Sequence, residues 1–283
     1  MQSDAVRAAI QAAGLTRIQP HLEALMTNSI RVTSTASSEK ALPVGSSKIG
    51  GAPDLPEAVI WPLMADVPLS FVAQFDLSAV APLDVNKLLP ASGLLSFFFD
   101  ANQQVYGSDP SDKAGWKVIY SAGDKSTLKR RTFPDKLPKE AQFTPCSVTF
   151  SAEVTLPQRP NLLDKTLDWN DKERYAYSDF IAAFPSEADR KTLHHRLLGY
   201  SDDLQDDMHL QAQLVSHGFK DDQSPEAKAL VSGAADWLLL FQLDSDFNAH
   251  MQWASTGLLY YWITKQDLQA KNFDKVWCVL QSE

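Results

Sequence analysis

The spacing of apolar residues along the chain predicts a protein of mixed strands and helices. Apolar runs, or strict alternation of apolar and polar residues, predict strands at residues 30–32, 69–75, 94–99, 116–120, 148–156, 237–243, 258–263 and 276–280. Helical spacing with capping residues predicts helices at 3–13, 16–26, 170–184, 186–195 and 202–217, and two more that begin at Ser224 and Thr264. The fold class indicated is α+β.

Residues 40–68 show neither the alternation typical of a strand nor the spacing typical of a helix. They contain three glycines and five prolines, which are Pro43, Pro53, Pro56, Pro62 and Pro68. That density of helix and strand breakers excludes a long regular element. The segment is too apolar for a linker, because Leu55, Ile60 and Trp61 would be poorly placed in solvent. We expect an ordered, packed loop in which Trp61 is buried.

Three local patterns occur twice in the same order, which predicts an internal duplication. IGGAPDLP, FVAQFDL and SGLLSFFF in the first half correspond to LLGYSDDLQ, LLFQLD and TGLLYYWI in the second. The residues matched are Gly51 with Gly199, Gln74 with Gln242, Asp76 with Asp244, and Gly93 with Gly257. Each half alone would leave an apolar sheet face uncovered. We therefore expect two similar strand units around a pseudo-twofold axis, with one shared core and peripheral helices.

The domain prediction follows from this repeat. We expect a single domain over residues 1–283, with N-terminal helices at 1–27 and repeat halves at 28–155 and 156–283. The sequence PQRP at 157–160 is the best candidate boundary between the halves.

Charge and composition narrow the possible partners. The formal charge is −9, from 35 acidic and 26 basic residues. A nucleic-acid-binding protein needs a basic face, so we expect neither nucleic-acid nor anionic membrane binding. No apolar run is long enough for a membrane span, and the N-terminus lacks the pattern of a signal peptide. Cys146 and Cys278 lie in apolar stretches, as buried thiols of a reducing compartment do. We expect a cytoplasmic location.

The repeated blocks also resemble a known family. The resemblance is to the YwqG-like family of bacterial proteins, and it spans nearly the whole chain in order. It is carried by SKIGGAPDLP (47–56), LSFVAQFDL (69–77), LPASGLLSFFFD (89–100), WLLLFQLDSD (237–246) and MQWASTGLLYYWITKQDL (251–268). The resemblance implies one compact α+β unit with a large, mainly antiparallel sheet system. It implies no assigned activity, cofactor or catalytic residue, and only a faint connection to immunity against secreted toxins.

The residues offer one candidate ligand site. Lys48 precedes the glycine pair Gly50–Gly51, whose backbone N–H groups could hold an anion, although a tight turn is the favoured explanation of the glycines. His195 could be a base or ligand, or a dipole partner at a helix end. Because a pseudo-twofold axis brings equivalent turns together, we expect a site bordered by Lys48, Gly50, Gly51, His195 and Tyr200.

Two other polar patterns have structural explanations. Asp202, Asp203, Asp206 and Asp207 could bind a cation, but acids at a helix start usually serve the helix dipole. Gln74 and Gln242 each sit in an apolar strand, two positions before Asp76 and Asp244. A buried amide must be hydrogen-bonded, so we expect both to hold neighbouring loops.

No catalytic motif is present, so two function classes remain open. The sequence contains no GxGxxG, GK[ST], GxSxG or HExxH pattern, and we expect no cofactor and no metal. We favour a non-enzymatic module that binds a protein or a small molecule. The alternative is a hydrolase-like enzyme with a site between the two halves.

Overall fold

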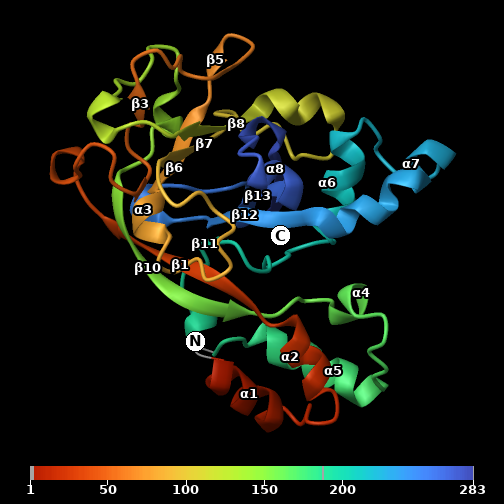
Figure 1. The fold of residues 1–283 in the computed structure, drawn as a ribbon. Helices are drawn as coiled ribbons and strands as arrows, with labels where there is room; N and C mark the ends of the chain where they lie inside the picture. The colour runs from red at the N-terminus through yellow and green to blue at the C-terminus, as the bar shows by residue number, and fades with distance from the viewer. Residues whose placement is uncertain (1–2, 187, 283) are drawn as a thin grey trace.

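The structure, a computed structural model, describes residues 3–186 and 188–282 and has the predicted α+β architecture. Its centre is a ten-stranded sheet in which every neighbouring pair is antiparallel, with helices and long loops around it (Figure 1). The order across the sheet is β14 (Trp277–Ser282), β13 (Gly257–Thr264), β12 (Trp237–Asp244), β11 (Arg196–Leu197), β1 (Thr27–Ala36), β10 (Cys146–Thr155), β2 (Lys48–Ile49), β6 (Ser70–Asp76), β7 (Leu94–Phe99) and β8 (Trp116–Ser121).

The strand order is symmetric about the central pair β1–β10. These strands pair along their whole length, with Thr33 opposite Thr149 near the middle. On one side lie β2, β6, β7 and β8, which we call the first arm; on the other lie β11, β12, β13 and β14, the second arm. Gln74 on β6 and Gln242 on β12 hold equivalent places, and each strand has a register shift before its glutamine. A pseudo-twofold axis requires such an order; the duplication itself stays a prediction.

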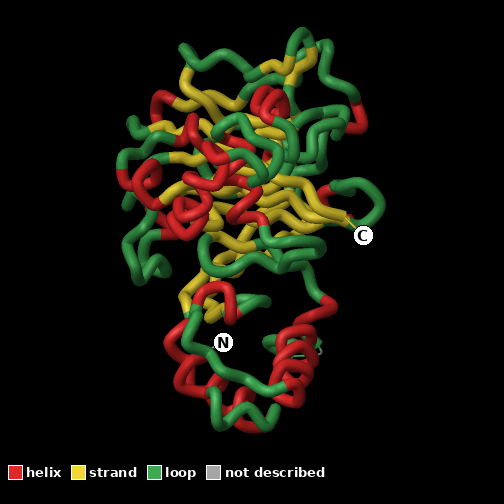
Figure 2. The backbone as a smooth tube through the Cα atoms, turned by 90° about the vertical axis from the view of Figure 1, so that its right-hand side faces the viewer, coloured by secondary structure: helices red, strands yellow, loops and turns green. Residues whose placement is uncertain are grey.

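The two arms share one apolar core. Phe75 and Phe97 of the first arm contact Phe241 of the second, each with ring centroids 4.9 Å apart. At the sheet ends, Trp116 of β8 and Trp277 of β14 lie 4.8 Å apart edge to face. Aromatic pairs of this geometry add to the free energy of simple area burial. The two arms therefore cover each other's apolar face. Figure 2 shows the strands of both arms gathered in the upper part of the molecule.

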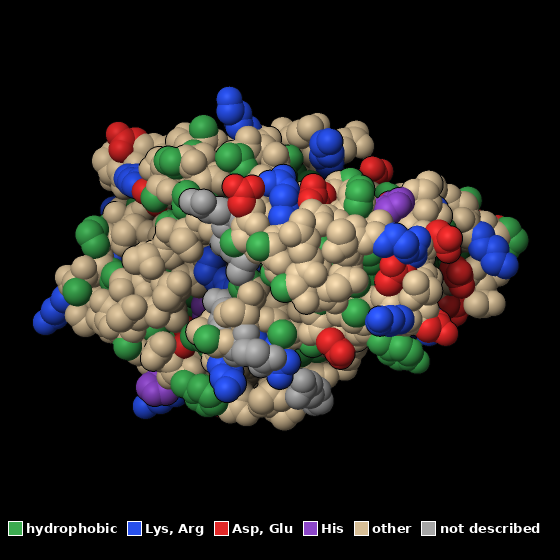
Figure 3. Space-filling model, turned by 90° about the horizontal axis from the view of Figure 1, so that it is seen from below, with side chains coloured by type: hydrophobic (Ala, Val, Ile, Leu, Met, Phe, Trp, Pro, Cys, Tyr) green, Lys and Arg blue, Asp and Glu red, His purple; other side chains and the backbone are tan. Residues whose placement is uncertain are grey.

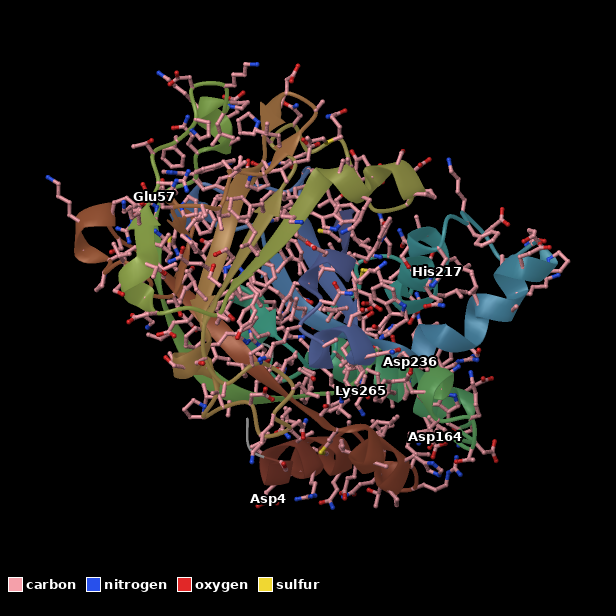
Figure 4. All side chains as sticks on the ribbon, turned by 45° about the horizontal axis from the view of Figure 1, so that its top comes forward. Asp4, Glu57, Asp164, His217, Asp236 and Lys265 are labelled. Atoms are coloured by element: carbon pink, nitrogen blue, oxygen red, sulfur yellow. The ribbon has the colours of Figure 1, made fainter. Side chains whose placement is uncertain are left out.

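The N-terminal helices form a lobe below the sheet with two helices of the second half (Figures 1 and 2). The lobe contains α1 (Ser3–Ala12), α2 (Gln19–Leu25), α4 (Pro160–Leu163) and α5 (Asp171–Ala182). Tyr177 is buried in it and donates to the carbonyl of Pro157 at 2.5 Å. Asp4 and Asp164 mark its two sides in Figure 4, and Asp164 pairs with His21 at 2.6 Å.

The remaining helices are short and begin at polar caps. They are α3 (Leu77–Val80), α6 (Met208–Ser216), α7 (Pro225–Leu230) and α8 (Lys265–Gln269). Ser224 caps α7 and Thr264 caps α8, as the sequence predicts, because each hydroxyl accepts a backbone N–H of the first turn.

Two predicted helices are wrong in extent. In the part of 186–195 that the structure describes, only a 3₁₀ turn forms at Asp189–Lys191. The helix predicted over 202–217 begins at Met208, where Asp207 is its cap. Residues 192–207 instead form the two-residue strand β11 and an irregular strap. Its backbone and polar groups bond β1 and β12 and also pair within the strap.

The proline-rich segment is a packed loop, as predicted, with short strand pairs. β3 (Asp54–Pro56) pairs with β9 (Leu128–Arg130), and β4 (Leu63–Met64) pairs with β5 (Val67–Pro68). Trp61 is 7% exposed, donates from Nε1 to the carbonyl of Leu69 at 2.9 Å, and packs edge to face on Phe98. The predicted burial of Trp61 is confirmed.

Acidic and basic side chains are interspersed on the surface seen from below, and no basic patch dominates that face (Figure 3). Among the residues that the structure describes, no helix has the length and apolar character needed to cross a bilayer.

Trp61→Ala is expected to destabilise the protein by about 3 kcal/mol or more. Removal of the large buried ring leaves a cavity, and the Leu69 carbonyl loses its hydrogen-bond donor. Thermal and denaturant unfolding would measure the loss. Ile60→Ala is the matched control, because the neighbouring Ile60 side chain is 83% exposed. Equal stability of the two variants would contradict the role of Trp61.

Candidate functional site

A buried ionic cluster anchors the turn after β2. Lys48 is fully buried, and its Nζ lies 3.5 Å from Glu39 Oε2 and 3.8 Å from Asp54 Oδ2. Arg130 donates to both oxygens of Asp54, at 2.9 and 3.2 Å. Burial lowers the pKa of Lys48, although Asp54 and Glu39 oppose the shift. Lys48 is thus enclosed by partners within the protein.

A second cluster lies at the matching place beside β11. Arg196 is 4% exposed, its Nη1 lies 3.0 Å from Asp202 Oδ1, and its Nε lies 3.3 Å from Glu153 Oε2. His194 Nδ1 lies 3.0 Å from Asp202 Oδ2. Burial alone would raise the pKa of Asp202, but Arg196 and His194 hold it well below the ordinary value. Arg196 opposite Gln242 thus corresponds to Lys48 opposite Gln74.

The two glutamines make the same hydrogen bonds. Gln74 Oε1 accepts from the N–H of Asp54 at 2.9 Å, and Gln242 Oε1 accepts from the N–H of Asp202 at 2.8 Å. Each Nε2 donates to a carboxylate oxygen of the same aspartate, at 2.7 and 2.8 Å, and to one loop carbonyl. Both buried amides therefore fasten a loop to the sheet.

The acids that follow the glutamines are also bound at equivalent places. The N–H of Asp76 donates to Ser47 Oγ at 2.8 Å, and the N–H of Asp244 donates to His195 Nδ1 at 3.0 Å. Since Nδ1 accepts, the ring proton of His195 is on Nε2, which lies 3.3 Å from Asp246 Oδ2. His195 is fully buried, and both of its ring nitrogens are occupied.

The glycine pair forms a tight turn around an internal carboxylate. Gly50 and Gly51 have φ of +67° and +71°. A Cβ on Gly50 would lie 2.2 Å from the carbonyl oxygen of Thr144, and one on Gly51 would lie 2.0 Å from Glu39 Oε1. The N–H of Ala52 donates to that same Glu39 oxygen at 2.5 Å. The anion held by this turn is therefore the side chain of Glu39.

The structure does not bring the predicted site residues together. Lys48 lies on β2 and His195 directly precedes β11, with β10 and β1 between these strands. Three strand spacings amount to roughly 14 Å of sheet. Lys48 and His195 are both enclosed, so neither faces a common ligand. A shared site with Gly50, Gly51 and Tyr200 has no geometric support.

Tyr200 alone of the five opens onto a groove. It is partly exposed and borders a hollow of about 130 Å³ with Leu198, His209 and Trp237. Nearby, burial raises the pKa of Asp203 to about 6. Within residues 3–186 and 188–282, no group of three or more His, Cys, Asp and Glu side chains could hold a metal ion.

A larger cavity lies at the junction of the two arms. It has a volume of about 320 Å³ and is lined by Ser70, Asp100, Ala101, Gln103, Glu140, Ala141, Phe143, His250, Gln252 and Ala254. We call it the junction cavity. Ser70 begins β6, residues 100–103 follow β7, residues 140–143 precede β10, and residues 250–254 join β12 to β13. Four separate segments thus build one hollow.

Hydrogen bonds between the halves fix the walls of this cavity. Gln103 Nε2 donates to the carbonyl of Gln252 at 3.0 Å, and its Oε1 accepts from the N–H of Ala254 at 3.1 Å. Thr144 Oγ1 lies 2.7 Å from His250 Nδ1. These cross-links hold the cavity in shape without a ligand.

One lining residue of the cavity carries an unsatisfied buried hydroxyl, and three others have strained backbone. Ser70 is 1% exposed, and its Oγ has no hydrogen-bond partner among the described residues. Such a group costs free energy unless a ligand or water completes it. Gln103, His250 and Ala254 have φ of +51°, +54° and +48°. Strained positions gather at binding sites.

No sequence motif marks this cavity. Its lining comes from four separate segments, and none of them carries a recognisable pattern. The available hint was the polar residue Ser70 at the start of an otherwise apolar strand, together with the polar runs ANQQ at 101–104 and NAHMQ at 248–252.

Comparison with known proteins gives a family but no activity. The family model described as "Domain of unknown function (DUF1963)" matches residues 47–282. The match covers every strand of the large sheet except β1. No curated protein matches the chain.

The equivalent glutamines give a paired expectation for stability. Gln74→Leu and Gln242→Leu should each cost about 1–3 kcal/mol, because each leaves a buried loop N–H without its acceptor. Chemical denaturation of both variants measures this. Gln269→Leu, at an exposed position of α8, is the control. A loss in one variant only would show that the two sites are not energetically equivalent.

Asp203→Asn should stabilise the protein at about pH 7.5 and much less at about pH 4.5. The folded-state pKa of about 6 exceeds the ordinary 3.8, so stability is lost as the pH rises through this window and Asp203 ionises. Asparagine does not ionise, so the Asp203→Asn variant does not lose stability in this way. Melting temperatures at both pH values measure it, and Asp206→Asn is the control because its side chain is 97% exposed. A gain that does not depend on pH would contradict the shift.

Proposed function

The chain belongs to the DUF1963 family, whose description assigns no activity, and from that premise we propose that the protein binds a small polar molecule in the junction cavity. The single observation that carries this proposal is Ser70, a lining residue of the cavity whose buried hydroxyl has no partner among the described residues.

The size and the lining of the cavity support the proposal. Its volume of about 320 Å³ lies at the lower end of the range of small-molecule sites. Phe143 and Ala141 give it an apolar wall, and Ser70, Gln252 and His250 offer polar groups. The cross-links through Gln103 reduce the ordering that a ligand would otherwise have to bring about, and such preorganisation favours binding.

Binding is favoured over hydrolysis by the environment of Ser70. A nucleophilic serine needs a base within hydrogen-bond reach of its hydroxyl. Ser70 Oγ has no such partner among the described residues, and Nδ1 of His250 already contacts Thr144 Oγ1. We therefore retain a non-enzymatic role and keep a hydrolase with a site between the halves as the alternative.

The broader elements of the proposal come from the sequence. They are a YwqG-like relationship, two arms that arose by duplication, a cytoplasmic and bacterial setting, and a role in interaction or immunity. The structural role of Gln74, Gln242, Asp76 and Asp244 belongs to the same proposal. None of these elements requires catalysis.

The test is a ligand screen by melting temperature against polar metabolites. A ligand that binds only the folded state raises the melting temperature with its concentration. Ser70→Ala should weaken the affinity of a genuine hit about 2- to 10-fold, because one hydrogen bond is lost. Ala101→Phe should abolish binding, because the larger ring fills the hollow.

The screen needs two controls. The unliganded variants must melt cooperatively, so that lost binding is not lost folding. Tyr200→Phe changes the separate groove and should leave the hit's affinity unchanged. Hits that survive Ala101→Phe and respond to Tyr200→Phe would move the binding site to that groove. Turnover of a hit by the wild-type protein that Ser70→Ala abolishes would instead favour the enzyme.

A further inference from the structure

The charged groups of the junction cavity are all acidic. Asp100 and Glu140 line it, and its lining contains no Lys or Arg. Asp100 is 3% exposed, and its two oxygens accept backbone N–H groups of Asn102 and Gln104 at 3.0 and 2.7 Å. A carboxylate has about four acceptor sites, so Asp100 can accept further hydrogen bonds.

Glu140 is an uncommitted carboxylate at the same cavity. It is exposed and forms no salt bridge among the residues that the structure describes. Asp54, Glu39, Glu153 and Asp202, by contrast, each lie within 4 Å of a basic side chain. A cavity with two acids and no internal cation favours a positively charged occupant, and the net charge of −9 adds to that preference.

The other lining groups suit an organic cation. The Ser70 hydroxyl can accept a hydrogen bond from an ammonium group, and the Phe143 ring offers an apolar and aromatic surface. In the described part of the chain, no three or more His, Cys, Asp or Glu side chains come together in a group that could hold a metal ion. The volume of about 320 Å³ also far exceeds one bare ion.

We propose that the ligand of the junction cavity is a small organic cation that carries an ammonium group. The ammonium group lies near Asp100 and Glu140 and donates to Ser70 Oγ, and the carbon skeleton packs on Phe143. This inference rests on the proposed function, because it names the chemical class of ligand for the same cavity.

The experiment compares probes of similar size and different charge. Butylammonium, choline, butyramide and butyrate are titrated into the full chain and followed by ligand-observed NMR, with calcium chloride as a separate titration. We expect saturable binding of butylammonium, at least about tenfold tighter than butyrate, and weaker at high ionic strength. Choline has no N–H that could donate to Ser70 Oγ, so it should bind more weakly than butylammonium. Ala101→Phe should abolish the binding of both cations.

Charge variants test the role of Glu140. Glu140→Gln should lower the affinity for the cation several-fold. Glu140→Lys should lower that affinity by more than about tenfold, because a like charge then faces the ligand. Glu226→Gln is the matched control, since it makes the same charge change on α7, which does not line the cavity. Glu140 is exposed, so these variants are expected to fold.

The outcomes separate this inference from the proposed function. Suppose that butyrate or butyramide binds at least as tightly as the cations, and that Ala101→Phe abolishes this binding while Glu140→Gln does not affect it. That result would overturn the proposal of a cationic ligand and leave the proposal of binding in the junction cavity standing. Calcium binding that Glu140→Gln removes, without ammonium binding, would also overturn the proposal of an organic cation. Binding of any probe that Ala101→Phe leaves intact would overturn both proposals, as would no saturable binding by any probe or screened metabolite.

Discussion

The central pairing of β1 with β10 is the interaction on which the rest of the structure depends. Every residue from Thr27 to Ala36 has a partner in β10, so these two strands form a continuous seam. The short strands β11 and β2 attach to opposite sides of it through two residue pairs each. Both arms are therefore placed by one ladder, and their shared aromatic core follows from that placement. β1 lies outside the 47–282 family match, yet it occupies the middle of the sheet.

Long apolar strands could be predicted from the sequence because their pattern is local. The run from Leu94 to Phe99 is read without knowledge of its neighbours, and its bounds agree with β7. The prediction of a helix over 186–195 was wrong because the structure of this segment depends on distant residues. Ser186 and Asp189 imitate a capping box, but Arg196 and Leu197 are needed as strand partners of Arg31 and Ile30. Tertiary pairing therefore overrides local capping preference in this segment.

The candidate site escaped prediction for geometric reasons. Gln74 and Gln242, which the sequence pairs, make equivalent hydrogen bonds, but equivalent residues do not have to converge. The strand order is symmetric about the β1–β10 pair, and it places Lys48 and His195 on opposite sides of that seam. The junction cavity instead uses loops that are not matched between the arms. Ser70 and His250 carry no motif, and only the fold brings their segments together.

The aromatic packing behind the cavity has an optical consequence. Trp253 is fully buried, and its ring lies 5.5 Å from that of Phe143, which lines the cavity. Its indole N–H has no hydrogen-bond partner among the described residues. Indole emission depends on the polarity and packing of its surroundings. A molecule that displaces water next to Phe143 would therefore change the fluorescence of this tryptophan, and the protein carries its own spectroscopic reporter of occupancy.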